Sequence, residues 1–175
     1  IVTTDVFPTG RARFDSFWAG IQDLLKSSDH VKRSIEAFAR GGWFGMGIGR
    51  GQTKLTGLPF PHTDSIFAVI GEETGVVGAV GVVMLYMGLL WRGLAISNRA
   101  KDGLGRLLAG GLAFWVVIEA SINMAVMVGL LPFAGNALPL ISAGGSSLVM
   151  TLAALGIVMN VARQSELNQK VTERT

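Results

Sequence analysis

Three long uncharged runs of apolar residues dominate the last two thirds of the chain. No charged residue occurs in 75–90 or in 121–161, and a third uncharged run covers 107–118. A hydrocarbon core of roughly 30 Å requires about 20 apolar helical residues. Almost no polar face recurs at helical spacing, as it would in the helices of a water-soluble protein. The pattern therefore predicts three membrane-spanning helices near residues 66–95, 107–128 and 145–161.

Residues 1–65, before the first run, have the mixed pattern of an extramembrane segment. Phe14, Phe17, Trp18 and Ile21 recur at helical spacing, and a second apolar set within 31–38 continues the periodicity. Amphipathic helices of this kind either lie along the membrane interface or pack against other parts of the same protein. Both interpretations stay open from the sequence.

The distribution of Lys and Arg between the two links predicts the orientation. The link at 96–106 is rich in Arg and Lys, whereas the link at 129–144 contains neither. Short basic loops stay on the cytoplasmic side, while long segments cross regardless of charge. We therefore expect the first link and the tail 163–175 to be cytoplasmic, and segment 1–65 and the second link to face outward. The predicted fold class is an all-α polytopic membrane protein with three transmembrane helices within 66–162.

Composition supports a membrane protein and narrows its partners. Apolar residues make up 50% of the chain and the mean hydropathy is +0.49, which exceeds what a soluble domain carries. The net charge is +3, yet the basic residues lie in separate segments, so lipid headgroups or an anionic substrate fit better than nucleic acid. The absence of cysteine excludes disulfides and thiolate metal sites within the chain. Because the chain begins at Ile1 rather than Met, we expect a piece of a larger protein.

The triplet His62-Thr63-Asp64 stands immediately before the first apolar run and is the strongest candidate for chemistry. An aspartate in this place either caps the following helix or acts as a base at the membrane edge. The ionisable residues around it favour the second role, and we interpret Asp64 as a candidate base. These neighbours in the sequence are Lys54, Glu72 and Glu73.

Glycine alternates with other residues from Gly45 to Gly51, upstream of the triplet. The run matches neither the dinucleotide-binding nor the Walker phosphate-binding motif, and no strand is predicted before it. It is therefore expected to be a hinge or a loop that packs closely against its neighbours. Its backbone N–H groups, beside Arg50 and Lys54, also offer a way to hold a diphosphate.

Two further features bear on function. Glu119 interrupts the second predicted span, where a charge is costly and should face a bundle interior or a polar cavity. It serves either as a relay for protons or ions or as the hydrogen-bond partner of Asn123. Pro132, Pro139 and Gly144 break the second link before the last helix, and a broken apolar segment at a membrane face can line a lipid-binding groove.

Two ordered motifs resemble one protein family. The first comprises Gly41-Gly42-Trp43-Phe44-Gly45, Lys54, Leu58-Pro59, His62-Thr63-Asp64, Ile66-Phe67-Ala68, Glu72-Glu73, Gly75 and Gly78. The second comprises Leu130-Leu131-Pro132, Gly135, Leu138-Pro139-Leu140-Ile141-Ser142 and Gly144-Gly145-Ser146-Ser147. Both are similar to signatures of the shape, elongation, division and sporulation (SEDS) family, which contains RodA and FtsW. The resemblance implies that the chain is the carboxy-terminal portion of a larger SEDS-type bundle.

The resemblance also implies an activity, namely peptidoglycan glycosyl transfer that polymerises lipid II at the outer face of the bacterial cytoplasmic membrane. It implies that Asp64 is essential, and we expect this residue to be the general base. Lipid II, membrane lipids and a class B penicillin-binding protein would be the partners. No cofactor is certain, and a divalent cation such as Mg²⁺ is an alternative source of positive charge. The expected substrate-binding residues are Lys54, Arg50, His62, Thr63, Glu72, Glu73, Ser142 and Ser146.

Two other functions fit the same family resemblance. A lipid II flippase predicts that the decisive ionisable residue lies at mid-membrane, as Glu119 does, whereas catalysis predicts that it lies at the outer rim. A non-catalytic scaffold for a penicillin-binding protein needs neither. Because the ionisable residues cluster at the rim, the sequence favours catalysis, and Ala134, where FtsW-like members often carry Lys, leaves division or elongation open.

Overall fold

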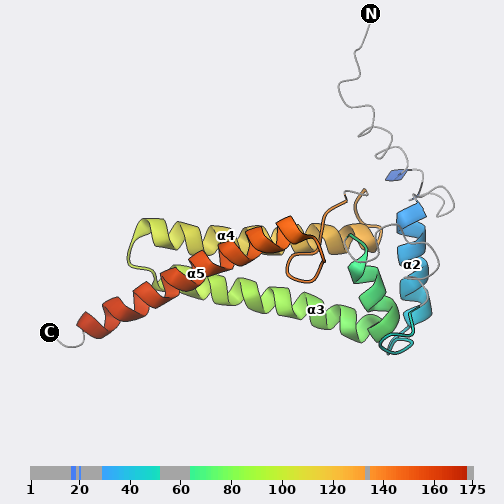
Figure 1. Cartoon of the computed structure of the whole chain (residues 1–175), viewed down its shortest axis with the longest axis horizontal. Helices are drawn as coiled ribbons and strands as arrows, with labels where there is room; N and C mark the ends of the chain where they lie inside the picture. Colours follow the sequence, from blue (N-terminus) through green and yellow to red (C-terminus); the bar gives the residue numbers. More distant parts are fainter. Residues whose placement is uncertain (1–16, 19, 21–28, 52–63, 133–134, 173–175) are drawn as a thin grey trace, which may run out of the picture. The chain divides into compact units, whose positions relative to one another are not determined.

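The computed structural model describes residues 17–18, 20, 29–51, 64–132 and 135–172, and within these ranges its regular structure is entirely helical. Within the described ranges four long helices follow one another (Figure 1): α2 (Asp29–Gly41), α3 (Ile66–Arg99), α4 (Gly103–Met127) and α5 (Gly145–Thr172). The predicted all-α fold class is confirmed.

Three of these helices are long and apolar enough to cross a membrane. The spans are Ile66–Arg99, Gly103–Met127 and Gly145–Leu167. Large apolar side chains such as Leu85, Leu107 and Met159 stay exposed along them, as expected of surfaces that face lipid or further helices rather than water. The three predicted spans are therefore confirmed, and each helix is longer than the sequence pattern suggested.

The amino end of α4 shows why this helix starts earlier than predicted. The backbone N–H of Gly105 donates to the Asp102 carboxylate at 2.6 Å, and the N–H of Arg106 donates to the Asp102 carbonyl at 3.1 Å. Asp102 is thus the N-cap of α4, a position at which aspartate is among the best residues. The charged link is correspondingly short, because the cap lies only three residues after Arg99.

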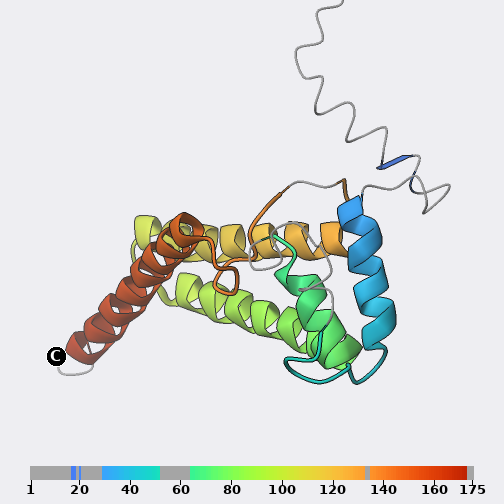
Figure 2. The same ribbon diagram turned by 45° about the vertical axis from the view of Figure 1, so that its right-hand side comes forward.

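The chain forms two compact units, of which the second contains residues 80–121 and 137–175. Within it α3 and α4 lie side by side (Figure 2), with small residues where they meet. A Cβ atom on Gly93 would lie 2.2 Å from the Cβ of Ala113, and one on Gly110 would lie 2.9 Å from the Ser97 hydroxyl. Glycine at these positions lets the two helix backbones approach closely, as is common in membrane bundles.

The segment before α5 packs against the middle of α3 in the same unit. The Tyr86 hydroxyl donates a hydrogen bond to the carbonyl of Pro139, and Tyr86 lies near the centre of the α3 span. The turn is closed by Ser142, whose hydroxyl accepts a hydrogen bond from the Leu138 N–H at 2.7 Å, while Leu140 adopts a positive φ of 66°. The second half of the predicted outer link is therefore packed against a spanning helix, where its backbone polar groups are bonded by protein.

The first unit contains residues up to Ala79 together with Ile122–Asn136. Its helix α2 buries one face, which includes Val31, Ser34 and Ala37. The Ser34 hydroxyl lies 3.4 Å from the sulfur of Met127. The amphipathic helix predicted at 31–38 is confirmed, and its buried face packs against other parts of the same protein. The preceding predicted helical piece lies mostly outside the described residues.

The amino-terminal part of α3 also packs tightly against α2. The rings of Phe38 and Phe67 lie 5.5 Å apart, and a Cβ atom on Gly71 would lie 2.1 Å from the Phe38 ring. A Cβ atom on Gly41 would lie 2.1 Å from the carbonyl oxygen of Gly71. Glycines 41 and 71 therefore allow the end of α2 to touch the backbone of α3.

Helix α3 is broken at Gly75, where φ is 71° and ψ is −168°. This conformation is essentially restricted to glycine. The loop that follows α2 supplies the hydrogen bonds that the break removes from the helix. These bonds join Met46 N to Glu72 O (3.0 Å), Gly47 N to Glu73 O (3.0 Å), Val76 N to Gly42 O (2.9 Å) and Val77 N to Trp43 O (3.2 Å).

The close approach at the break explains the glycines of the loop. A Cβ atom on Gly75 would lie 2.5 Å from the Gly45 nitrogen and from the Trp43 carbonyl oxygen. One on Gly45, whose φ is 79°, would lie 2.2 Å from the carbonyl oxygen of Glu73. The expectation that the glycine run packs closely against its neighbours is confirmed at Gly45.

Candidate active site

Asp64 lies in the turn that leads into α3, one residue before the helix cap. The carbonyl of Ser65 accepts hydrogen bonds from Ala68 N at 3.0 Å and from Val69 N at 3.3 Å. Ser65 therefore occupies the N-cap position. Its hydroxyl is buried and makes no hydrogen bond to the described part of the chain.

The Asp64 carboxylate is half-buried and does not cap α3, since no hydrogen bond to it is formed by any described residue. A Cβ atom on Gly135, whose φ is 27°, would lie 3.4 Å from its Oδ2 atom. The carboxylate thus lies beside the backbone of Gly135. Asp102 shows the contrast, because it bonds the first turn of its helix directly. The capping role considered for Asp64 is not seen here.

Asn123 of α4 hydrogen-bonds the backbone at Asp64 and at Asn136. Its amide nitrogen donates to the carbonyl of Asp64 at 3.0 Å and to the carbonyl of Asn136. Asn123 is 1% exposed, and its Oδ1 atom has no hydrogen-bond partner among the described residues. One side chain therefore ties Asp64, two residues before α3, to Asn136 in the link after α4.

The sequence analysis did not identify Asn123 as part of the site. The sequence suggested Asn123 only as a hydrogen-bond partner of Glu119, which lies one helical turn earlier in α4. Both amide hydrogens of Asn123 are instead directed at backbone carbonyls, so the suggested Glu119–Asn123 hydrogen bond is not observed. The sequence offered no way to select it, because α4 also contains Glu119 and Ser121 among its apolar residues. The two carbonyls that Asn123 bonds lie 59 and 13 positions away.

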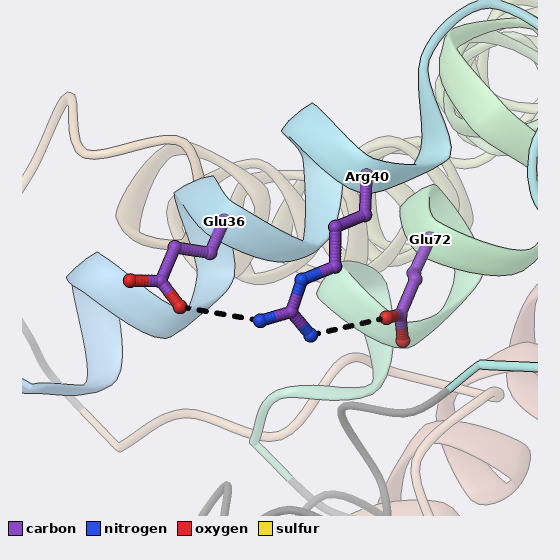
Figure 3. Close-up of polar contacts among 3 residues, drawn as sticks. All are labelled: Glu36, Arg40 and Glu72. Carbon is purple, nitrogen blue, oxygen red and sulfur yellow. Dashed lines mark ion pairs between the residues drawn. The ribbon is translucent and has the colours of Figure 1, made fainter.

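Arg40, at the end of α2, joins α2 to α3 through carboxylates on either side of it. Its guanidinium lies 3.7 Å from Glu72 Oε1 and 3.6 Å from Glu36 Oε2 (Figure 3). The Glu72 side chain is fully buried, at 0% exposure. Burying a carboxylate is costly unless it is paired, so Arg40 provides charge compensation that the sequence analysis missed.

Glu72 and Glu73 also lie close to the end of the glycine loop. A Cβ atom on Gly51 would lie 2.9 Å from Glu72 Oε2 and 3.1 Å from Glu73 Oε1. The absence of a side chain at Gly51 therefore lets the chain pass beside both acids. The structure gives Glu72 a partner within the protein, and the substrate-binding role expected of both acids stays a prediction.

The remaining predicted site residues fall into three groups. Arg50 is exposed and makes no ion pair within the described ranges, while its N–H closes a turn onto Gly47 O at 3.1 Å. Ser142 is buried within the turn before α5, and Ser146 is exposed in the first turn of α5. Lys54, His62 and Thr63 lie outside the described residues.

No group of three or more potential metal-ligating side chains occurs in the part of the chain that the structure describes. Carboxylates and imidazoles are the usual protein ligands of divalent ions. The expectation of no certain cofactor, with Mg²⁺ as an alternative, stays a prediction.

Comparison with known proteins assigns this arrangement to one group of sequences. The model of the FtsW, RodA and SpoVE family, described as "Cell cycle protein", matches residues 1–167. A probable peptidoglycan glycosyltransferase FtsW of Alkalilimnicola ehrlichii is 46% identical over 157 residues, covering 88% of this chain and 38% of the relative. Stage V sporulation protein E of Bacillus subtilis is 40% identical over 153 residues, covering 87% of this chain and 42% of that protein.

A solved structure has the same fold. It belongs to work on the structural coordination of polymerization and crosslinking by a peptidoglycan synthase complex, with a TM-score of 0.68 and 33% sequence identity. The match covers 90% of this chain and 43% of that chain. The chain therefore spans about 40% of the length of the relatives that it matches.

Proposed function

Because this chain belongs to the FtsW, RodA and SpoVE family of cell cycle proteins, we propose that the whole protein is a peptidoglycan glycosyltransferase. It polymerises lipid II into glycan strands at the outer face of the bacterial cytoplasmic membrane. Curated relatives that carry this activity in their names support the reaction class. The observation that carries the site is the Asp64 carboxylate, which lies at the start of a membrane-length helix and is not used to cap it.

Asp64 is the general base of this proposal. Its carboxylate takes the proton from a sugar hydroxyl of the acceptor as that oxygen attacks the anomeric carbon of the donor. The bond from the anomeric carbon to the lipid diphosphate breaks, and the diphosphate leaves with the electron pair. One base suffices, because a diphosphate leaves without being protonated, whereas glycoside hydrolases need a second carboxyl group as an acid.

The backbone around Asp64 suits this role. Asn123 fixes the Asp64 carbonyl, while the absence of a side chain at Gly135 leaves space beside Oδ2. A base must be held in place and still be reachable by the hydroxyl that it deprotonates. His62 orients the carboxylate, while Arg50, Lys54 or a divalent ion offsets the charge that develops on the leaving diphosphate.

A related solved structure supports a proposal for the partner, and the charges of the links support one for the orientation. The related solved chain comes from a complex that couples polymerization to crosslinking. We therefore propose that a crosslinking enzyme, a class B penicillin-binding protein, works with this protein. The basic link after α3 lies in the cytoplasm, and Asp64 faces the outside, where lipid-linked sugars are polymerised.

The decisive experiment replaces Asp64 by Asn in the whole protein and measures lipid II polymerisation with the partner present. Asn keeps the size of the side chain but cannot accept the proton, so the rate should fall about a hundredfold or more. The matched control is Asp102→Asn, which makes the same chemical change at the cap of α4. Asn caps helices as well as Asp does, so this variant should polymerise at nearly the wild-type rate.

The same assay separates the proposal from lipid transport. Glu119→Gln should leave polymerisation largely intact, since Glu119 is not part of the proposed chemistry. Near wild-type polymerisation by Asp64→Asn, together with blocked lipid translocation by Glu119→Gln, would replace the glycosyltransferase by a lipid II flippase. Equal loss of membrane insertion in both aspartate variants would assign Asp64 a structural role.

A further inference from the structure

A cavity of about 100 Å³ lies between the carboxy-terminal ends of α3 and α5, within the second unit. One wall is formed by a single face of α3, because its residues follow the spacing i, i+3, i+4 and i+7. The other wall is formed by α5 at the spacing i, i+3 and i+4. The lining residues are Arg92, Ala95, Ile96 and Arg99 from α3 and Ala162, Ser165 and Glu166 from α5.

The two arginines of this cavity make no polar contact with the rest of the described chain. Neither Arg92 nor Arg99 forms an ion pair or a hydrogen bond with any residue that the structure describes. Arg106, at the same end of the unit, is engaged and donates to the carbonyl of Ala100 at 3.5 Å. Two guanidinium groups that line one cavity outnumber its single carboxylate, Glu166, so the cavity keeps an excess of positive charge.

The position along the helices indicates what neutralises this charge. Arg92 and Arg99 lie in the last two turns of the Ile66–Arg99 span, and Glu166 lies at the end of the Gly145–Leu167 span. Trp91, next to Arg92, is 77% exposed. Exposed tryptophan is enriched where membrane helices reach the headgroups. The cavity is therefore level with the lipid phosphates of the leaflet at this end of α3.

The size of the cavity fits one phosphate group. The volume of about 100 Å³ is well above the roughly 10–15 Å³ that one water molecule requires, so a compact group such as a phosphate has room to enter. Arginine binds phosphate oxygens through planar pairs of N–H donors. Basic pockets between membrane helices are known to take the headgroups of anionic lipids.

From this cavity, its two arginines and its level in the membrane, we infer that the protein binds an anionic phospholipid at the ends of α3 and α5. The lipid phosphate enters the cavity and accepts hydrogen bonds from Arg92 and Arg99, while the acyl chains lie along the exposed apolar surface of α3. Glu166 lowers the affinity, because it repels the anion. This site is distinct from Asp64 and does not depend on the proposed enzyme activity.

The test measures lipids retained by the whole protein, purified in mild detergent, by native mass spectrometry. Phosphatidylglycerol, phosphatidylethanolamine and phosphatidylcholine are added in equal amounts. Wild type should retain phosphatidylglycerol preferentially, and Arg92→Gln or Arg99→Gln should each weaken this retention about fivefold. Arg163→Gln, which removes an exposed arginine outside the cavity, is the control and should retain phosphatidylglycerol like the wild type.

A variant that is expected to bind phosphatidylglycerol more tightly shows that the losses in the arginine variants are not caused by misfolding. Glu166→Gln removes the repelling carboxylate and should strengthen phosphatidylglycerol retention about fivefold. Weaker retention of phosphatidylglycerol by this variant would overturn the inference, because it would show that Glu166 supports binding rather than opposing it. Equal retention of all three lipids, or equal loss in Arg163→Gln, would overturn it as well.

Inorganic phosphate distinguishes a lipid from a free anion. An excess of phosphate should displace little phosphatidylglycerol, because the acyl chains add apolar contact that phosphate lacks. Complete displacement by phosphate, dependent on both arginines, would show that the cavity takes a free anion and would overturn the lipid assignment. Absence of any retained lipid would show that the rest of the protein fills the cavity.

Discussion

At the scale of single residues, Asp64 and Asp102 differ in what their carboxylates bind, although both are aspartates just before a helix. Both precede a long apolar helix, and from sequence alone each is an equally good cap. Asp102 bonds Gly105 N, whereas the cap position of α3 is held by Ser65. The triplet His62-Thr63-Asp64 made Asp64 a candidate base, a role that stays a prediction, and the structure adds that no described residue is capped by its carboxylate.

Arg40 gives the first prediction at this scale. Arg40→Met removes the ion pair with buried Glu72 and should lower the stability of the whole protein by about 1–2 kcal/mol. This is less than the roughly 3–5 kcal/mol lost when a fully buried pair is broken, because the Arg40 side chain is 43% exposed. The measurement is the midpoint of thermal unfolding in detergent.

Glu36→Gln is the matched control for Arg40, since it breaks the exposed pair with the same guanidinium. Exposed pairs four residues apart on a helix contribute about 0.3–0.5 kcal/mol, so the midpoint should hardly move. Equal destabilisation by both variants would show that Arg40 acts through α2 alone. This contact could not be predicted from the sequence, because 32 positions separate Arg40 from Glu72 and only tertiary packing brings them together.

At the scale of elements, α3 departs most from its sequence pattern. The apolar run predicts a single span over 66–95 and does not distinguish the glycines within it. Gly93 lies where α3 approaches α4. Gly75 instead breaks the helix, and the loop 42–47 packs beside the break. The prediction placed residues on both sides of Gly75 in one span, although Glu72-Glu73-Thr74 precede this glycine and Val76-Val77 follow it.

Gly75→Ala tests the break. The substitution places a Cβ atom 2.5 Å from two backbone atoms of the loop and forces alanine into a conformation that only glycine adopts readily. The combined cost should be about 3 kcal/mol or more, which is seen as a clear fall in the thermal midpoint of the whole protein. Lipid II polymerisation should fall with it, because the segment that carries Asp64 loses its attachment to the loop.

The control for this prediction lies two turns further along the same helix. A Cβ atom on Gly81 meets nothing within 4 Å, and alanine favours a helix over glycine by up to about 1 kcal/mol. Gly81→Ala should therefore leave the midpoint unchanged or raise it slightly. A Gly75→Ala protein as stable as Gly81→Ala would mean that α3 runs straight through this position.

At the scale of the whole molecule, the sequence predicted the number, order and type of spanning helices correctly. Uncharged length alone decides whether a helix can cross a bilayer, so no tertiary information was needed. The ends were less accurate: α4 begins at Gly103 rather than 107, and α5 continues to Thr172 rather than 161. Charged residues can extend a membrane helix beyond the hydrocarbon, and the apolar pattern does not record that extension.

Topology is the prediction that belongs to this scale. The chain has no cysteine, so single cysteines at Asn98 and Asn136 can be introduced into an otherwise cysteine-free whole protein. A membrane-impermeant thiol reagent applied to intact cells should label position 136 and leave position 98 unlabelled, because the basic link stays in the cytoplasm. Permeabilised cells, in which both positions should react, provide the control, and the reverse pattern in intact cells would invert the proposed orientation.

The break in α3 also changes how the length of this helix compares with the thickness of a bilayer. A helix of 34 residues is about 51 Å long, far more than a hydrocarbon core of roughly 30 Å. The part after Gly75 measures about 36 Å and is long enough to span by itself. Residues 66–74 are then not needed to cross the bilayer. The loop 42–47 satisfies the backbone groups at the break, which lipid could not do. We therefore expect Asp64, two residues before α3, to lie outside the length of helix that the hydrocarbon requires.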